Sequence, residues 1–181
     1  MSTADASPTG IVRWEVLKGL PGEGPNPKHF HMGHPTPWAE GFVVKFINPD
    51  ETTWVGNFQS SRFGHTEVIA WPEADSIVVI AADDFYLVDI NHSDSYETLG
   101  PQHLVSGVMF DEERRTLFVA ELYGICAFGI ERKRKWIAEG LGGLILGLIS
   151  CVGGVLTVEV EEETGEPSRI ARLSAKDGTT L

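Results

Sequence analysis

The chain has 181 residues, 42% of them hydrophobic, a length and composition that suit one globular domain over residues 1–181. Its 26 acidic residues outnumber 14 basic ones, so the net charge is −12 and the overall field repels phosphate backbones and anionic lipid. This balance argues against nucleic-acid and membrane binding, and it favours a protein partner with a basic face.

The first ten residues, MSTADASPTG, are small and polar and lack the charged and apolar regions of a secretory signal. We therefore expect a cytoplasmic protein in which Cys126 and Cys151 are reduced and structural. The longest uncharged stretch, residues 141–158, contains five glycines and is too short and too interrupted for a transmembrane helix.

The expected elements begin with a strand over residues 11–17. A Pro- and Gly-rich insertion at 19–38 follows, predicted as a long ordered loop that covers one end of the sheets. Strands are then expected over 42–47 and 52–55, which together with the first strand make a partial unit.

From Gly64 onward the chain repeats. The block 64–110 can be laid on 104–150 without a gap, because residues 40 positions apart match in identity or in apolar character. The identical pairs are Val68 and Val108, Glu73 and Glu113, Val79 and Val119, Ile90 and Ile130, Gly100 and Gly140, Leu104 and Leu144, and Gly107 and Gly147.

Each repeat contains short β-branched or aromatic runs separated by turn residues, and each run predicts a strand. The first unit has runs at 66–70, 76–82, 85–90 and 96–99. The second has runs at 104–110, 116–121, 125–130 and 135–138, and the third has them at 144–150, 155–160 and 169–173. Four strands in about 40 residues leave no room for a crossover helix. The pattern therefore predicts an all-β fold of four-stranded antiparallel meanders, as in the blades of a β-propeller.

The segments FYLVDIN at 85–91 and YETLG at 96–100 resemble the third and fourth strands of blades in the WD40, quinoprotein and YVTN-type propeller superfamily. This resemblance implies the fold and no catalytic residue. With the partial N-terminal unit, the count is about 14 strands, or three and a half blades. The alternatives are an open arc and a ring completed by a homodimer.

Three of the six histidines lie in the insertion: His29, His31 and His34. His29 and His31 project to the same side of an extended segment, and a turn at Gly33 brings His34 close, which is a plausible set of nitrogen ligands for zinc or another transition metal. The alternative is a metal-free loop, with no cofactor, whose aromatic residues Phe30 and Trp38 pack against the sheets.

His65 and His103 precede the first strands of successive units, a position that faces the central channel of a propeller, where ligands bind. Together with Trp71, which is a candidate interface anchor, and Trp38 of the insertion, they form the predicted binding set. The basic run at 132–135 is interpreted as a solvated hairpin, too narrow for nucleic-acid recognition.

The sequence contains no Gly-x-Ser-x-Gly elbow, phosphate-binding glycine loop, Cys-x-x-Cys or His-Glu-x-x-His motif. This favours a non-catalytic binding or protein-interaction module over an enzyme. The alternative is a metal-binding protein or metal-dependent enzyme that uses His29, His31 and His34.

Overall fold

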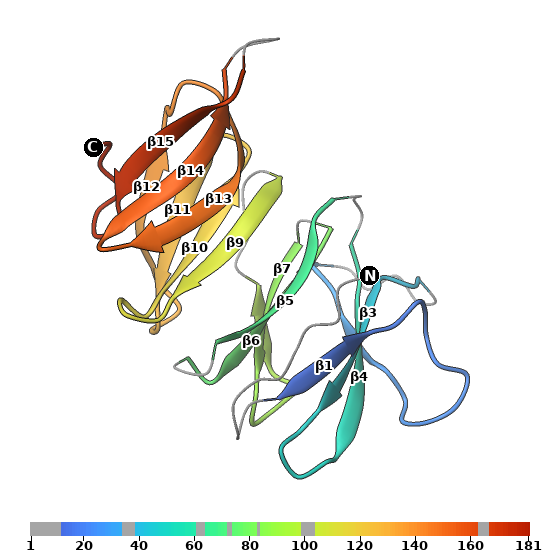
Figure 1. Cartoon of the computed structure of the whole chain (residues 1–181). Helices are drawn as coiled ribbons and strands as arrows, with labels where there is room; N and C mark the ends of the chain where they lie inside the picture. Colours follow the sequence, from blue (N-terminus) through green and yellow to red (C-terminus); the bar gives the residue numbers. More distant parts are fainter. Residues whose placement is uncertain are drawn as a thin grey trace. The chain divides into compact units, whose positions relative to one another are not determined.

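The computed structural model describes residues 12–33, 39–60, 64–71, 74–82, 84–98, 104–162 and 167–181. In these ranges the strands form four sheets, three of four strands and one of three, and the expectation of an all-β, propeller-like fold is confirmed (Figure 1). The chain divides into two compact units, residues 1–100 and 101–181, and each contains two of the sheets.

The first sheet of the N-terminal unit combines the predicted partial unit with one additional strand. Its strands are β1 (Arg13–Val16), β2 (Lys28–Phe30), β3 (Phe42–Ile47) and β4 (Thr53–Phe58), in the order β1-β3-β4-β2. β1, β3 and β4 are antiparallel, whereas β2 pairs in parallel with β4.

The additional strand β2 comes from the insertion, where the sequence predicted only a loop. His29 is exposed, whereas Phe30 is fully buried and stacks on Phe58 with ring centroids 4.4 Å apart. The backbone continues the pairing, since the Gln59 amide donates to the Phe30 carbonyl at 2.9 Å. The expected half blade is therefore a complete four-stranded sheet.

The second sheet of this unit is the predicted meander. Its strands are β5 (Thr66–Trp71), β6 (Ser76–Ala81), β7 (Asp84–Asp89) and β8 (Tyr96–Thr98), paired in sequence order. β6 is buried on both faces, as expected for a central strand that reads as a continuous apolar run.

The core of the N-terminal unit lies between its two sheets and is rich in aromatic side chains. Its buried members are Val12, Phe30, Val44, Phe46, Trp54, Phe58, Val68, Ile77, Val79, Ala81, Tyr86 and Val88. Phe46 stacks on Trp54 with ring centroids 4.1 Å apart, and Tyr86 lies tilted against Phe58 at 5.4 Å. These large side chains supply most of the apolar surface that holds the two sheets together.

The C-terminal unit also contains two sheets. The first consists of β9 (Val105–Asp111), β10 (Thr116–Glu121), β11 (Gly124–Gly129) and β12 (Arg134–Glu139). The second consists of β13 (Leu144–Val152), β14 (Val155–Glu161) and β15 (Arg169–Ser174), also paired in sequence order. Figure 1 shows β13 beside β9, so each sheet of this unit presents one face to the other.

The core of the C-terminal unit is mainly aliphatic. Its buried members are Phe118, Ala120, Ile125, Ala127, Ala138, Leu141, Ile145, Leu156, Val158, Val160, Ala171, Leu173 and Ala175. Trp136 covers one margin of it, and its indole Nε1 donates to the carbonyl of Ala175 at 3.3 Å.

The 40-residue repeat keeps its phase in the strands. Val79 and Val119 hold equivalent register positions and are both buried, at 0% and 2% exposure. Val88 is also buried, but its counterpart Phe128 is half-buried. The repeat therefore fixes strand register more strictly than it fixes burial at every position.

Candidate functional site

The C-terminal unit contains a half-open hollow of about 560 Å³, which we call the Tyr123 hollow. It is built from the β10–β11 turn, the β12–β13 connection and the end of β14. Its lining residues are Tyr123, Gly140, Leu141, Gly142, Gly143, Leu144, Glu161 and Glu162. Turns at the end of sheets are where propeller-like folds carry their binding surfaces.

Glycine shapes the floor of this hollow. Gly140 and Gly142 have positive φ angles of 70° and 80°, a backbone conformation that glycine adopts without steric cost. Gly143 is needed because the backbone of Glu161 lies close to it: a Cβ atom at position 143 would be 2.0 Å from the carbonyl oxygen of Glu161. The β12–β13 connection can therefore run directly against the end of β14.

Polar contacts hold the walls in place. The Arg169 guanidinium donates to the carbonyl of Leu141 and forms an ion pair with the carboxylate of Glu162. Across the hollow, the amide of Ile145 donates to the carbonyl of Leu122 at 2.9 Å, which ties β13 to the β10–β11 turn. The hollow is thus bounded by fixed backbone on two sides.

Tyr123 separates this hollow from a smaller one of about 280 Å³, lined by Glu121, Tyr123, Gly124, Ile137, Glu139 and Gly140. The Tyr123 side chain is 54% exposed. Glu121 is buried and accepts a hydrogen bond from the Cys126 thiol at 3.5 Å. Burial, followed by the charge of Glu121, raises the pKa of Cys126 to about 12, so this thiol stays protonated at neutral pH.

Four carboxylates therefore line the two hollows around one half-exposed aromatic ring. Arg169 neutralises Glu162, but within the described ranges Glu139 and Glu161 have no salt-bridge partner. An aromatic face beside unpaired carboxylates favours an organic cation, through cation–π attraction and charge-assisted hydrogen bonds.

The predicted metal ligands lie in part within the described residues. His29 Nδ1 faces Asn57 Nδ2 at 3.1 Å, so it accepts from an amide that also donates to the carbonyl of Ala39. His31 follows β2, and its Nδ1 is buried. His34 lies outside the described residues, and among those that are described no group of three metal-ligating side chains comes together.

The predicted binding residues also differ in their placement. His65 is half-buried, and its Nε2 lies 2.7 Å from the carboxylate of Glu67. Trp71 ends β5 and is fully buried, so it offers no exposed surface to a partner. Trp38 and His103 lie outside the described residues.

Sequence reasoning missed the Tyr123 hollow. A signal was present in Gly140-Leu141-Gly142-Gly143, a glycine-rich connection between two predicted strands. Glycines at such a place indicate close backbone approach or positive φ angles. What the sequence did not reveal is that Glu161 and Glu162, some twenty residues later, border the same space.

No protein-family model and no curated protein matches the sequence. Solved structures do match. With a TM-score of 0.54, the chain is similar to hydrazine synthase of Kuenenia stuttgartiensis, at 13% identity over 77% of this chain and 43% of that one. With a TM-score of 0.51, it is similar to a protein of unknown function from Bacteroides caccae, at 8% identity over 78% and 59%.

The chain spans about half the length of these structures. At such low identity the likeness shows the fold alone, and the fold is β-propeller-like. In the part of the chain that the structure describes, no helix is long and apolar enough to cross a membrane.

Proposed function

We propose that the chain is a non-catalytic binding module that recognises a basic protein partner, and that the Tyr123 hollow receives a lysine or arginine side chain of that partner. The observation that carries the proposal is the half-exposed Tyr123 ring beside Glu139 and Glu161, neither of which has an ion-pair partner in the described ranges. A guanidinium or ammonium group lies favourably over an aromatic ring and also donates charge-assisted hydrogen bonds to carboxylates.

The rest of the chain supports the same class of partner. The net charge of −12 attracts basic surfaces at long range and accelerates their association at low salt. Mutations of the hollow should therefore alter dissociation, whereas added salt should mainly slow association.

The test uses a short arginine-containing peptide and its citrulline counterpart, which keeps the shape and loses the charge. We expect the arginine peptide to shift the NMR signals of Tyr123 and of the 140–143 connection, and the citrulline peptide to leave them unchanged. Tyr123→Ala, and separately Glu139→Gln with Glu161→Gln, should each weaken binding about tenfold.

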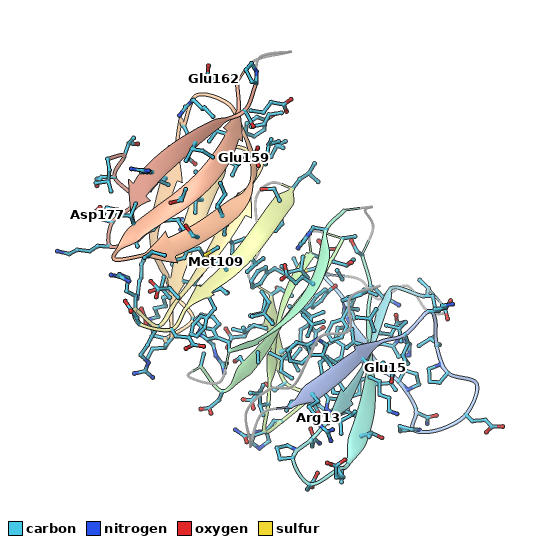
Figure 2. All side chains as sticks on the ribbon, viewed as in Figure 1. Arg13, Glu15, Met109, Glu159, Glu162 and Asp177 are labelled. Carbon is cyan, nitrogen blue, oxygen red and sulfur yellow. The ribbon has the colours of Figure 1, made fainter. Side chains whose placement is uncertain are left out.

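Glu15→Gln is the matched control, because Glu15 is an exposed acid of the N-terminal unit and its loss changes the net charge alone (Figure 2). The control should bind like the wild type. Equal weakening in Glu15→Gln, or equal binding of the citrulline peptide, would refute recognition in the hollow.

A metal site on the insertion is the second candidate. The observation in its favour is the His31 Nδ1 atom, which is buried without a hydrogen-bond partner among the described residues and is thus free to act as a ligand. His29, His31 and His34 would supply three nitrogens for zinc. Elemental analysis of protein purified without chelators tests this, and a metal content below stoichiometric would end the metal hypothesis.

Homodimerisation is a further part of the proposal. Ile149, Val152 and Ile170 are exposed on the C-terminal unit, at 50%, 72% and 54%. Two chains of four sheets supply eight, within the range of closed propellers, and β1 of one chain would then lie beside β15 of the other. Light scattering should give twice the 19.8 kDa chain mass, and Ile170→Lys should return it to the single-chain value.

A further inference from the structure

A third hollow of the C-terminal unit has a volume of about 530 Å³, and we call it the basic hollow. Its lining residues are Arg114, Thr116, Lys135, Gly154, Ala175 and Lys176. It lies at the end of the β13–β15 sheet opposite the Tyr123 hollow. Figure 2 shows Asp177, the neighbour of Lys176, and Glu162 at these opposite ends.

The Arg114 guanidinium pairs with two carboxylates through Nη1, one of its two terminal nitrogens. Nη1 donates to the carboxylates of Asp111 at 3.0 Å and Glu113 at 3.4 Å. Nη2 lies against Gly154, since a Cβ atom added to that glycine would be 3.0 Å from it. The second edge of the guanidinium thus lies beside a residue that lines the hollow, and in the described part of the chain no carboxylate pairs with it.

Lys135 is positioned by a short chain of hydrogen bonds. Its Nζ donates to Thr116 Oγ1 at 2.9 Å, and that hydroxyl donates to the carbonyl of Arg114, also at 2.9 Å. An ammonium group has three donors, and within the described ranges one of them is used, by Thr116. This anchoring reduces the rotamer entropy that Lys135 loses when a ligand binds.

Lys176 adds a third cation from the turn after β15. Its backbone neighbourhood is rigid, because the Ala175 amide donates to Gly154 and the Ala175 carbonyl accepts from Trp136. Neither Lys135 nor Lys176 has a salt-bridge partner within the described ranges. Three cations therefore converge on one hollow in a chain whose net charge is −12.

We propose that the basic hollow is a binding site for a phosphate group, contacted by Arg114, Lys135 and Lys176. A carboxylate presents two acceptor oxygens, whereas a phosphate dianion presents three, one for each of the three cations. The hollow also has room for the small organic part of a phosphate monoester. This site is separate from the one proposed for a basic partner, so either proposal can fail without the other.

The first experiment titrates the full chain with inorganic phosphate at constant ionic strength and follows amide and indole NMR signals. Saturable shifts should be confined to Lys135, Gly154, Lys176 and the Trp136 indole. Glycerol 3-phosphate forms a second arm, and tighter binding of it than of inorganic phosphate would identify a monoester as the ligand. Succinate forms a third arm and should bind at least about tenfold more weakly.

The variants separate specific binding from general attraction. Lys135→Gln with Lys176→Gln should weaken phosphate binding about tenfold or more. Lys133→Gln removes a charge from the same hairpin but outside the hollow, and it should change the affinity less than about twofold because exposed charges are screened. The proposal is overturned by unsaturable shifts in the wild type, by equal losses in the double variant and the control, or by succinate binding as tightly as phosphate.

Discussion

The two units share a strand pattern but fill their cores differently. The N-terminal core stacks Phe30 on Phe58 and Phe46 on Trp54, whereas the C-terminal core is made chiefly of aliphatic and alanine side chains. Two units of the same class of fold therefore fill their cores with side chains of different shape and volume, provided that each core is filled.

One pair of repeat-equivalent positions shows the difference sharply. Trp71 ends β5 and is fully buried, and the residue 40 positions later, Asp111, ends β9 and is also buried. Asp111 accepts from Arg114 at 3.0 Å and from the Cys151 thiol at 3.2 Å. A buried indole ring and a hydrogen-bonded carboxylate thus occupy equivalent positions at the ends of β5 and β9.

The largest expected effect is at Phe30. Phe30→Ala should destabilise the N-terminal unit by about 3–5 kcal/mol, since it removes a fully buried ring that stacks on Phe58 and meets Tyr96 edge-on at 5.1 Å. Denaturant unfolding followed by tryptophan fluorescence measures the loss, because four of the five tryptophans lie in residues 1–100.

Thiol labelling provides the matching readout for the other unit. Both cysteines lie in residues 101–181, and burial raises the pKa of Cys126 to about 12 and that of Cys151 to about 11. Native protein should therefore react slowly at pH 8, and labelling should accelerate only when the C-terminal unit opens. If Phe30→Ala accelerates labelling as much as Phe118→Ala does, the two units unfold together and the contrast between their cores has no energetic consequence.

The next effect concerns two glycines, one in each unit, at which the backbone of another strand comes unusually close. Gly41 precedes β3 and Gly143 precedes β13, and at each a Cβ atom would lie 2.0 Å from a carbonyl oxygen, that of Phe58 or of Glu161. Gly41→Ala and Gly143→Ala should each cost about 3 kcal/mol. Gly147→Ala is the control, because its nearest atom would be 4.0 Å away, and a comparable loss there would show that the clash is not the cause.

A smaller effect is expected at Asp111. Burial raises its pKa, but hydrogen bonds from Cys151 and Arg114 outweigh burial, and the pKa of Asp111 is lowered overall. The Asp111 carboxylate therefore stabilises the folded chain at pH values above about 4, the pKa of the carboxyl group in the unfolded chain. This stabilisation is lost as the pH falls through the lower pKa of Asp111 in the folded chain. Asp111→Asn should cost about 1–2 kcal/mol at pH 7 and progressively less below pH 4.

Urea unfolding from pH 7 to pH 2 measures this dependence. Glu113→Gln serves as the control, since Glu113 is the exposed second partner of Arg114 and should contribute little. If the difference in free energy of unfolding between the wild type and Asp111→Asn stays constant down to pH 2, the ionised carboxylate is not the source of the stabilisation.

The smallest effect is expected at Tyr123. Tyr123→Ala should change the free energy of unfolding by less than about 0.5 kcal/mol, because the side chain is more than half exposed at a turn. The same variant should lose binding of the arginine peptide. A large loss of stability would instead make Tyr123 a packing residue and would remove the main support for the hollow as a binding site.

Sequence predicted the antiparallel strands well, because β-branched and aromatic runs in a gapless repeat placed strands such as Thr116–Glu121 at their observed limits. It missed β2, since a three-residue strand among prolines and glycines has no alternation to detect and its partner is a parallel strand. It also missed the Tyr123 hollow, whose walls depend on the approach of Gly143 to Glu161. His34, Trp38 and His103 stay predictions.

The parallel pairing of β2 has a consequence for the chain as it leaves the ribosome. Phe30 lies opposite Phe58, so β2 cannot be completed until 28 more residues have been made. At about 5–20 residues per second, the ring stays uncovered for a few seconds. In the second sheet, each strand pairs with the one made just before it, so its backbone hydrogen bonds can form in the order of synthesis. The first sheet therefore depends on a pairing between segments far apart in the chain, whereas the second is built from neighbouring strands.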